Sequence, residues 1–327
     1  MSPIYGVFAN AFRQRLAKAI IHSLLKEACE LIALHFPGVN AWARETTFQR
    51  LLRVDRNETD LQAISPILAT KAELPTRAAG AARQSWLRGP LSPEISPKDL
   101  HIWRVGLDVR WSWSFDEALS LDDRMRADRF RFESDRRRFC VARASLRLIL
   151  GRYLKAKPGR LQLDVGDYGK PFLVDRKTSQ GIRFNLSHSH RLALIAIGRD
   201  REVGVDIEFM RPNFVTDEVV KHFFSRAEVE AFAAVAPAFK AQSFFNCWTR
   251  KEAYIKARGE GLSCSLEEFD VSLAPGAPAA LLDSRLDPKE TSRWRLQDLF
   301  PAPGYAATVA VEGGFPRLAL WDFDQGP

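Results

Sequence analysis

Two acidic residues, Asp206 and Glu208, are the residues of this chain best suited to chemistry. Val203, Val205 and Ile207 alternate with them, which is the period of a β-strand that has one apolar face and one acidic face. Two carboxylates on the same face of a strand repel each other unless a cation lies between them. Mg²⁺ prefers oxygen ligands, commonly one or two carboxylates together with substrate phosphates. The pattern therefore predicts a divalent-metal site.

A third acid, Glu252, lies in a predicted helix that spans 240–258. At helical spacing it shares a face with Trp248, Lys251, Ile255 and Lys256. The two apolar residues of this face predict packing on the core, which would hold the acid and both lysines at the core margin. The simpler alternative is a surface pair, since Glu252 and Lys256 at i, i+4 stabilise a helix by only about 0.3 kcal/mol. Three acids with basic neighbours indicate chemistry on a phosphate ester or anhydride.

A run of hydroxyls and histidines, from Ser187 to His190, follows a strand predicted at 182–185. Small hydroxyls and an imidazole after a strand suit hydrogen bonding to phosphate. The sequence has no Gly-x-Ser-x-Gly segment that would favour a serine nucleophile. Zinc binding by His188 and His190 is disfavoured because no cysteine or third histidine stands nearby. A structural histidine is the plain alternative.

Basic residues outside these segments are further candidate phosphate ligands. Lys170 stands in a predicted turn, where we expect an exposed side chain that is either a plain turn residue or a phosphate contact. The predicted helical region 124–154 is dense in arginine interleaved with phenylalanine and leucine. Some of these guanidinium groups must therefore lie at the core margin, where they are suited to phosphate binding. They are Arg126, Arg129, Arg131, Arg136, Arg137, Arg138, Arg143 and Arg147.

The elements that must position these residues begin near Leu100. Ser120 predicts the N-cap of a helix, and Gly259 stands where a helix from 240 to 258 should end. Further helices are predicted at 216–223 and 225–236, and strands at 101–109, 171–174, 182–185, 192–197, 202–208, 268–273, 294–300, 306–312 and 318–323. Helices and strands recur in two comparable blocks, 101–209 and 210–327. Residues 1–100 predict a helical segment followed by a linker, to which no function is assigned.

Composition and charge exclude several classes of protein. The 327 residues are 46% hydrophobic and 11% aromatic, which indicates a globular protein with a substantial core. Four widely spaced cysteines form no Cys-x-x-Cys pair, which favours buried thiols in a reducing cytoplasm. No stretch approaches the roughly 20 apolar residues of a membrane span. The net charge of +8 favours an acidic partner or polyanionic substrate, but no zinc finger or basic RNA motif favours nucleic acid.

With these residues in hand, the chain resembles an Sfp-type 4′-phosphopantetheinyl transferase. Each matching segment is weak alone, but five segments in the order and spacing of the family are specific. The resemblance covers about 101–327 and leaves 1–100 outside it. It implies a pseudo-twofold α+β fold with the active site between two similar halves, preceded by a largely helical extension. The segments are Gly169–Pro171, Phe184–Ser189, Gly204–Glu208, Phe223–Ser225, and Trp248–Lys256 continuing to Gly261–Leu262.

The resemblance also implies an activity. The enzyme would move the 4′-phosphopantetheine group from coenzyme A to a serine of an acyl or peptidyl carrier protein, with Mg²⁺ as cofactor, and release adenosine 3′,5′-bisphosphate. The expected partner is an acidic carrier protein, which suits a basic enzyme. Peptide synthetase or polyketide synthase systems of secondary metabolism are favoured. Because both halves stand in one chain, a monomer is expected.

Roles for single residues follow from matching motif positions. The resemblance implies that Asp206, Glu208 and Glu252 hold Mg²⁺ against the pyrophosphate, and it leaves open whether Glu252 is a metal ligand, the base for the serine hydroxyl, or both. Lys251 and Lys256 would contact the pyrophosphate. The phosphates of coenzyme A would be contacted by Lys170, Ser187, His188, Arg138 and Arg126, the last at a position where the family often has a lysine.

Two other functions use the same residues. A magnesium-dependent phosphohydrolase or nuclease would use the three acids without any carrier protein. A degenerate relative that only docks carrier proteins would need none of the chemistry. The presence of all three acids and both lysines disfavours the second alternative.

Overall fold

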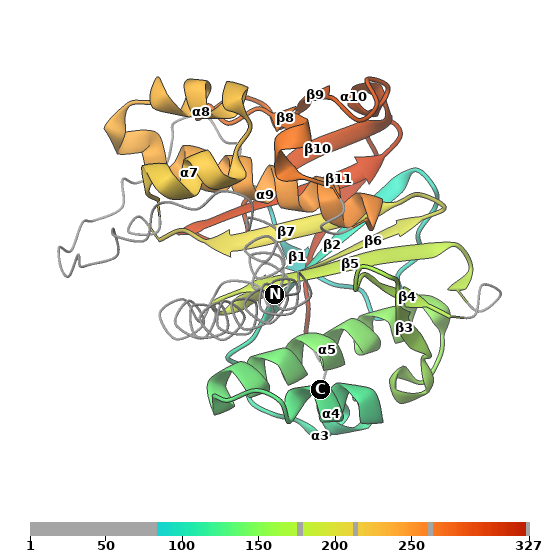
Figure 1. Cartoon of the computed structure of the whole chain (residues 1–327). Helices are drawn as coiled ribbons and strands as arrows, with labels where there is room; N and C mark the ends of the chain where they lie inside the picture. The colour runs from blue at the N-terminus through green and yellow to red at the C-terminus, as the bar shows by residue number, and fades with distance from the viewer. Residues whose placement is uncertain (1–83, 175–178, 212–214, 261–263, 325–327) are drawn as a thin grey trace, which may run out of the picture. The chain divides into compact units, whose positions relative to one another are not determined.

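Two β-sheets lie face to face, with helices on both outer sides (Figure 1). The computed structural model describes residues 84–174, 179–211, 215–260 and 264–324. They belong to one unit that spans Leu74–Pro327. The mixed arrangement of sheets and helices confirms the predicted α+β class. Three predicted features lie outside the described residues. They are the helical segment within 1–100, most of the linker after it, and the motif end Gly261–Leu262.

The larger sheet has five strands and the smaller has three. The first has the order β1 (Leu87–Arg88), β12 (Arg317–Asp322), β2 (Asp99–Gly106), β6 (Leu192–Arg199) and β5 (Ile182–Ser189). The second has the order β10 (Trp294–Leu299), β11 (Tyr305–Glu312) and β7 (Val203–Phe209). Two short pairs are β3 (Leu163–Val165) with β4 (Pro171–Leu173), and β8 (Phe269–Val271) with β9 (Leu281–Ser284).

The two sheets do not follow the order of the chain. The acidic strand β7 pairs with β11, although its neighbours in sequence, β5 and β6, belong to the larger sheet. Conversely, β12 from the end of the chain lies parallel to β2. The predicted blocks 101–209 and 210–327 therefore exchange strands, and the division between them stays a prediction.

Helices cover the outer face of each sheet. On the larger sheet lie α3 (Trp113–Ala118), α4 (Leu121–Ala127) and the long α5 (Glu133–Leu154). On the other side lie α9 (Lys240–Arg258), α7 (Asp217–Phe223), α8 (Arg226–Ala233) and the short α10 (Glu290–Arg293) (Figure 1). Ser120 caps α4 in a capping box, and Gly259 ends α9 with φ +72°, so both predicted helix ends are confirmed. The predicted region 124–154 is broken by non-helical residues between α4 and α5.

The sheets are buried on both sides, which explains the apolar runs of β2 and β6. Alternate residues of these strands pack against α5, and the others pack between the two sheets. The α5 side includes Trp103, Val105, Ile195 and Leu146. The layer between the sheets includes Ile102, Leu194, Val205, Ile207 and Val309. Cys140, Cys247 and Cys264 are buried thiols, as expected, and Cys29 lies outside the described residues.

A buried histidine forms part of the core around α5. The His101 Nδ1 atom lies 2.8 Å from the Tyr153 hydroxyl oxygen, which also accepts a hydrogen bond of 2.9 Å from the indole N–H of Trp103. The Tyr153 hydroxyl still has one proton and one lone pair, so its bond to His101 can run in either direction, according to the tautomer of the imidazole. Burial lowers the pKa of His101 to about 4.

We expect this histidine to make stability depend on pH. The folded pKa of about 4 lies below the unfolded value of about 6.5, so the unfolded chain binds more protons between these values. Stability from this group is therefore present above about pH 6.5 and is lost as the pH falls towards 4. At about pH 5 the loss is ~2 kcal/mol. Urea unfolding of the protein and of His101→Gln at about pH 7.5 and about pH 5 measures it. If the stability of both proteins depended equally on pH, His101 would not be the group responsible.

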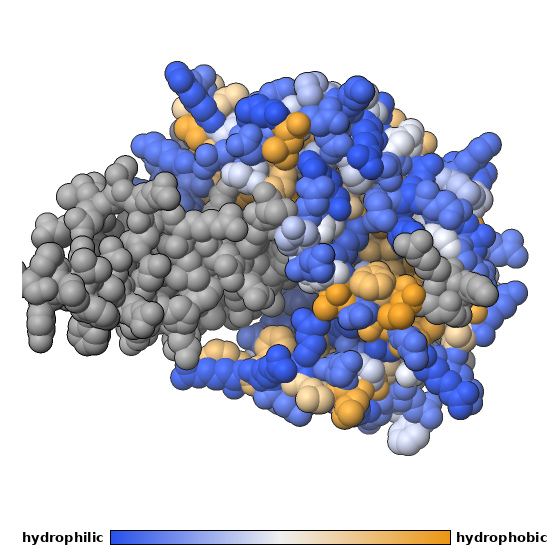
Figure 2. Space-filling model, turned by 45° about the vertical axis from the view of Figure 1, so that its right-hand side comes forward, coloured by the Kyte–Doolittle hydropathy of each residue, from blue (hydrophilic) through white to orange (hydrophobic). Residues whose placement is uncertain are grey.

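The surface is mainly hydrophilic on the face shown in Figure 2, with smaller hydrophobic patches between charged and polar residues. Exposed apolar side chains near the β3–β4 pair are Val165, Tyr168, Phe172 and Val174. Across the described ranges, no helix is both long and apolar enough to cross a membrane.

Candidate active site

The three acids meet where α9 packs on β7. Gly204, Asp206 and Glu208 lie on the same face of β7, and α9 covers this face. A Cβ atom on Gly204 would lie 2.2 Å from the Ala253 carbonyl oxygen and 2.2 Å from the Ala257 amide nitrogen. Glycine is therefore required for this close approach. It lets Glu252, which projects from α9, lie in the layer that holds the two strand acids. We call Asp206, Glu208 and Glu252 the acidic cluster.

The acidic cluster is buried, and one lysine enters it. Asp206 is 1%, Glu208 6%, Glu252 4% and Lys256 8% exposed. The Lys256 Nζ atom lies 2.5 Å from Asp206 Oδ1. Burial disfavours the charge of this lysine, but Asp206 and then Glu252 oppose that effect, so the net result raises the pKa of Lys256. The alternative of a surface Glu252–Lys256 pair is wrong, because both side chains are buried.

One lysine does not balance three carboxylates. Burial, and then the neighbouring Asp206 carboxylate, raise the pKa of Glu208 well above its usual range, although the Ser189 hydroxyl and Lys256 oppose them. The Glu252 carboxylate also raises the pKa of Glu208. Burial and the neighbouring carboxylates therefore disfavour the ionised form of Glu208. A second positive charge would allow all three acids to ionise.

The donor atoms of the cluster suit a hard divalent cation. The Oδ2 atom of Asp206 is buried and has no hydrogen-bond partner among the described residues. Carboxylate oxygens are the ligands that Mg²⁺ prefers, so the three acids fit this ion chemically. Within the described ranges, however, no group of three or more His, Cys, Asp or Glu side chains is arranged to hold a metal ion. Mg²⁺ therefore stays a proposal.

Ser187 and Ser189 lie within β5 and not after its end, which corrects the predicted strand 182–185. The Ser187 hydroxyl donates to Asp206 Oδ1 over 2.9 Å, and its oxygen accepts from the Ile207 N–H over 3.4 Å and from Lys256 Nζ over 3.2 Å. The Ser187 hydroxyl therefore bonds to an acid, to the backbone of β7 and to Lys256, and its predicted contact with a coenzyme A phosphate stays a prediction.

His188 lies on the other face of β5. Side chains alternate along a strand, so His188 shares the face of Phe184, which packs in the core around α5. The half-buried His188 is thus separated from the two serines that flank it in the sequence. The predicted run of phosphate contacts is divided between the two sides of the strand.

Lys251 does not reach the acidic cluster. Its side chain is 1% exposed, and its ammonium donates to the carbonyl oxygens of Leu266 and Phe269 over 2.6 and 2.7 Å. The third partner is the Glu228 carboxylate at 2.7 Å. All three N–H donors of the ammonium therefore have protein acceptors. Lys251 thus ties α9 to β8 and α8, and its contact with the pyrophosphate stays a prediction.

The other predicted basic residues lie in different surroundings. The expectation that Lys170 is exposed is wrong, since its side chain is 17% exposed and its Nζ binds Glu202 Oε2 at 2.8 Å and the Ala257 oxygen at 2.9 Å. Burial lowers the pKa of Lys170. Arg138, on α5, forms an ion pair of 3.0 Å with the exposed Asp108. Arg126 is exposed on α4.

Two of the arginines of α5 hold α4 in place. Arg143 Nε lies 2.7 Å from Asp123 Oδ1, and Arg147 Nε lies 2.6 Å from Asp123 Oδ2. Burial disfavours the Asp123 charge, but the two arginines outweigh it and lower the pKa of Asp123 to about 2. These guanidinium groups lie at the core margin as predicted, but they bind a carboxylate of the fold.

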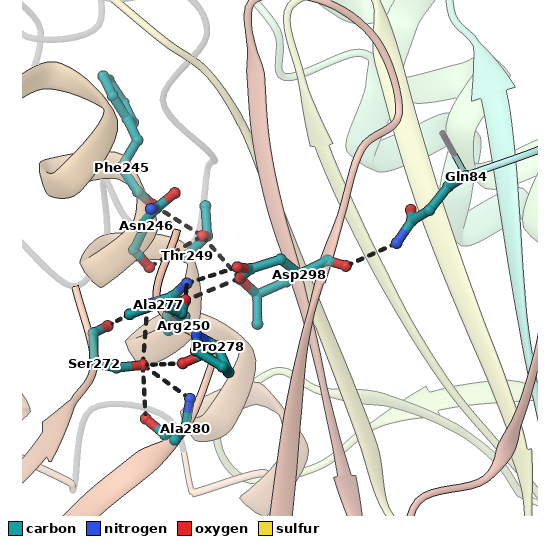
Figure 3. Close-up of polar contacts among 11 residues, drawn as sticks. Gln84, Phe245, Asn246, Thr249, Arg250, Ser272, Ala277, Pro278, Ala280 and Asp298 are labelled. Atoms are coloured by element: carbon teal, nitrogen blue, oxygen red, sulfur yellow. Dashed lines mark hydrogen bonds and ion pairs between the residues drawn. The ribbon is translucent and has the colours of Figure 1, made fainter. Parts of the chain in front are cut away.

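Arg250 is a further buried charge of α9 with a structural role (Figure 3). Its guanidinium binds Asp298 through two bonds, Nε to Oδ1 at 3.1 Å and Nη2 to Oδ2 at 2.6 Å. The same group donates to the carbonyl oxygens of Ser272 and Ala277. Bidentate pairs of this kind fix orientation as well as distance. Arg250 therefore joins α9 to β10 and to the segment after β8.

Ser189 was not among the predicted site residues. Its hydroxyl donates to Glu208 Oε2 over 2.8 Å. The sequence feature that points to Ser189 is its alternation with Asn185 and Ser187, which places three polar side chains on one face of a strand. The sequence does not show that this face meets β7.

Comparisons with known proteins show the family of this chain. Residues 202–310 match a family model described as the 4′-phosphopantetheinyl transferase superfamily, and residues 109–199 match one for the N-terminal part of a 4′-phosphopantetheinyl transferase. The 4′-phosphopantetheinyl transferase HetI of a Nostoc species is 40% identical over 74% of this chain and 99% of its own length. The 4′-phosphopantetheinyl transferase Sfp of Bacillus subtilis is 30% identical over 49% of this chain and 68% of its own. The chain therefore belongs to the 4′-phosphopantetheinyl transferase superfamily.

Proposed function

We propose that this phosphopantetheinyl transferase converts apo carrier proteins to their holo form in a magnesium-dependent reaction with coenzyme A. The observation that carries the proposal is the buried acidic cluster with Lys256, because one ammonium leaves the three carboxylates short of positive charge. A phosphoanhydride brings further negative charge, which a metal ion and a lysine can neutralise together.

The acidic cluster would hold the metal and activate the nucleophile. Asp206, Glu208 and Glu252 would bind Mg²⁺, which supplies neutralisation of the pyrophosphate charge when it is bound. Glu252 would accept the proton of the carrier serine hydroxyl when it is not needed as a ligand. The serine oxygen then forms a bond to the phosphorus of the phosphopantetheine arm, and the bond to the bridging pyrophosphate oxygen breaks. Adenosine 3′,5′-bisphosphate leaves with the electron pair, close to the Lys256 ammonium.

The remaining basic residues divide into phosphate ligands and residues of the fold. We retain Lys256, Arg138, Lys170 and His188 as ligands of the coenzyme A phosphates, with Arg126 as an outer contact. Arg138 is favoured because Arg191 and Arg211 also act electrostatically on its neighbour His190, where the acid Asp108 opposes them and pairs with Arg138 and Arg191. Lys251 is left out, since its ammonium already has three acceptors.

The partner would be an acidic carrier protein. A net charge of +8 favours association with an acidic surface. We further propose that the chain acts as a monomer in the cytoplasm and serves a peptide synthetase or polyketide synthase system.

The test is the intact mass of apo carrier proteins after incubation with the enzyme, coenzyme A and Mg²⁺. We expect a gain of one phosphopantetheine group, lost when EDTA removes the metal. A gain that persists in EDTA would overturn the metal assignment. Cleavage of coenzyme A without any carrier would support the phosphohydrolase alternative, and no reaction with a broad panel of carriers would support the non-catalytic one.

A further inference from the structure

The edge of β7 that faces away from β11 is bonded to side chains of β5. The N–H groups of Val205, Ile207 and Phe209 point outward from this edge, towards β5. They donate to Asn185 Oδ1 over 2.9 Å, to Ser187 Oγ over 3.4 Å and to Ser189 Oγ over 3.0 Å. We call Asn185, Ser187 and Ser189 the bridging residues. Because each strand has a period of two, the same offset of 20 residues repeats at all three positions.

Two of the bridging residues also bind the metal-site acids. The Ser187 hydroxyl donates to Asp206 Oδ1 over 2.9 Å, and the Ser189 hydroxyl donates to Glu208 Oε2 over 2.8 Å. At the third position, opposite Asn185, β7 carries Gly204, and α9 fills the space beside it. The three bridging residues therefore support the same strand edge, but only the serines touch a carboxylate.

Each serine hydroxyl links the backbone of β7 to a carboxylate. A hydroxyl has one proton and two lone pairs. The serine oxygen accepts from the N–H of Ile207 or Phe209 and donates its proton to the neighbouring carboxylate. The position of each acid oxygen is thereby tied to the backbone of β7 and to the spacing between the two sheets.

We infer that Ser187 and Ser189 are positioning residues, whose hydroxyls orient the Asp206 and Glu208 carboxylates for the divalent cation. This inference rests on the proposed function in one respect, namely that the acids bind a metal. Partners of this kind orient ligands directly bound to a metal, and their loss typically lowers metal affinity by about 10- to 100-fold.

Ser189 gives the sharper test, because Ser187 also accepts from Lys256. The variants are Ser189→Ala, which loses the donor to Glu208, and Ser189→Thr, which keeps a hydroxyl. Asn185→Ala is the matched control, since it removes a bond to the edge of β7 without removing a donor to an acid. Binding of Mn²⁺ to the full chain is followed by electron paramagnetic resonance, with and without coenzyme A, and folding is followed by urea unfolding.

We expect both alanine variants to unfold at lower urea concentration, because each leaves a buried N–H without its acceptor. Only Ser189→Ala should weaken Mn²⁺ binding, by about tenfold or more, and Ser189→Thr should restore it. The Mg²⁺ concentration that gives half-maximal rate should likewise rise only in Ser189→Ala and return towards the normal value in Ser189→Thr.

Two results would overturn the inference. Ser189→Ala with unchanged Mn²⁺ affinity would show that the hydroxyl supports only the fold. An equal loss of affinity in Asn185→Ala would show that any damage to the strand edge has this effect. If the unaltered chain bound no Mn²⁺ under either condition, the metal assignment of the proposed function would itself be wrong, and the serines would have no metal site to support.

Discussion

Replacing Asp206 by asparagine should lower the rate of carrier modification by at least about a thousandfold. The substitution keeps the size of the side chain and an oxygen that can accept from Ser187, but it removes the negative charge that faces Lys256 at 2.5 Å. It also removes the buried Oδ2 atom, which has no partner among the described residues. The loss should therefore fall on metal binding and on charge neutralisation in the transition state.

The measurement is the initial rate of holo-carrier formation at saturating coenzyme A, together with circular dichroism to show that the variant is folded. Asp322→Asn is a matched control, because Asp322 is also an aspartate at a strand position and is paired with an arginine, Arg104, at 2.7 Å. It lies on β12, separated from β5 by two strands of the larger sheet. We expect its rate to stay within about twofold, as for substitutions away from a site. A folded Asp206→Asn protein with normal rate would refute the role of Asp206.

Replacing Lys256 by methionine should mainly impair the handling of coenzyme A. Methionine retains much of the aliphatic stem but removes the ammonium that lies beside Asp206 and Ser187. Because breaking a buried ion pair leaves unbalanced charge, we expect a loss of about 3 kcal/mol in stability. Without its cation the site should also bind the pyrophosphate less well, and we expect the KM for coenzyme A to rise by about tenfold or more.

Lys251→Met is the matched control for this second prediction. It also removes a buried ammonium from α9, one that is paired with Glu228 at 2.7 Å. We expect a comparable loss of stability but a KM for coenzyme A within about threefold of the normal value, since the three N–H donors of this ammonium already have acceptors in the protein. Steady-state kinetics and urea unfolding of both variants make the comparison. The assignment fails if Lys256→Met leaves the KM unchanged, or if Lys251→Met raises it equally.

Lys251 and Lys256 lie on the same helix, but only Lys256 contacts an acid of the acidic cluster, and the sequence did not predict this difference. Along an α-helix, residues five apart differ by about 140° in direction. Lys251 and Lys256 therefore stand at opposite margins of the face that also holds Trp248 and Ile255. The prediction that the two apolar residues pack on the core is confirmed, since Trp248 is 8% and Ile255 1% exposed. Which margin faces the acids depends on the neighbours of α9, and these are distant in sequence.

Local features were predictable because they depend on near neighbours. The alternation of Val203, Val205 and Ile207 predicted β7, and Ser120 and Gly259 marked helix ends that the structure confirms. Short elements such as α3 and β9 are too brief to show a period, so they were not predicted. The helical break between α4 and α5 was also missed, because the arginine-rich sequence there keeps an apolar pattern throughout.

The sequence by itself determined the acids of β7, the helix that carries Glu252 and, through five ordered motifs, the family. Only the tertiary structure decided that Ser187 bonds to Asp206, that Lys251 supports β8, and that Arg143 and Arg147 bind Asp123. The physical reason is that a hydrogen-bonding side chain takes whatever partner its surroundings place within reach. That partner is set by how β5, β7 and α9 pack, and residue type and local spacing do not record it.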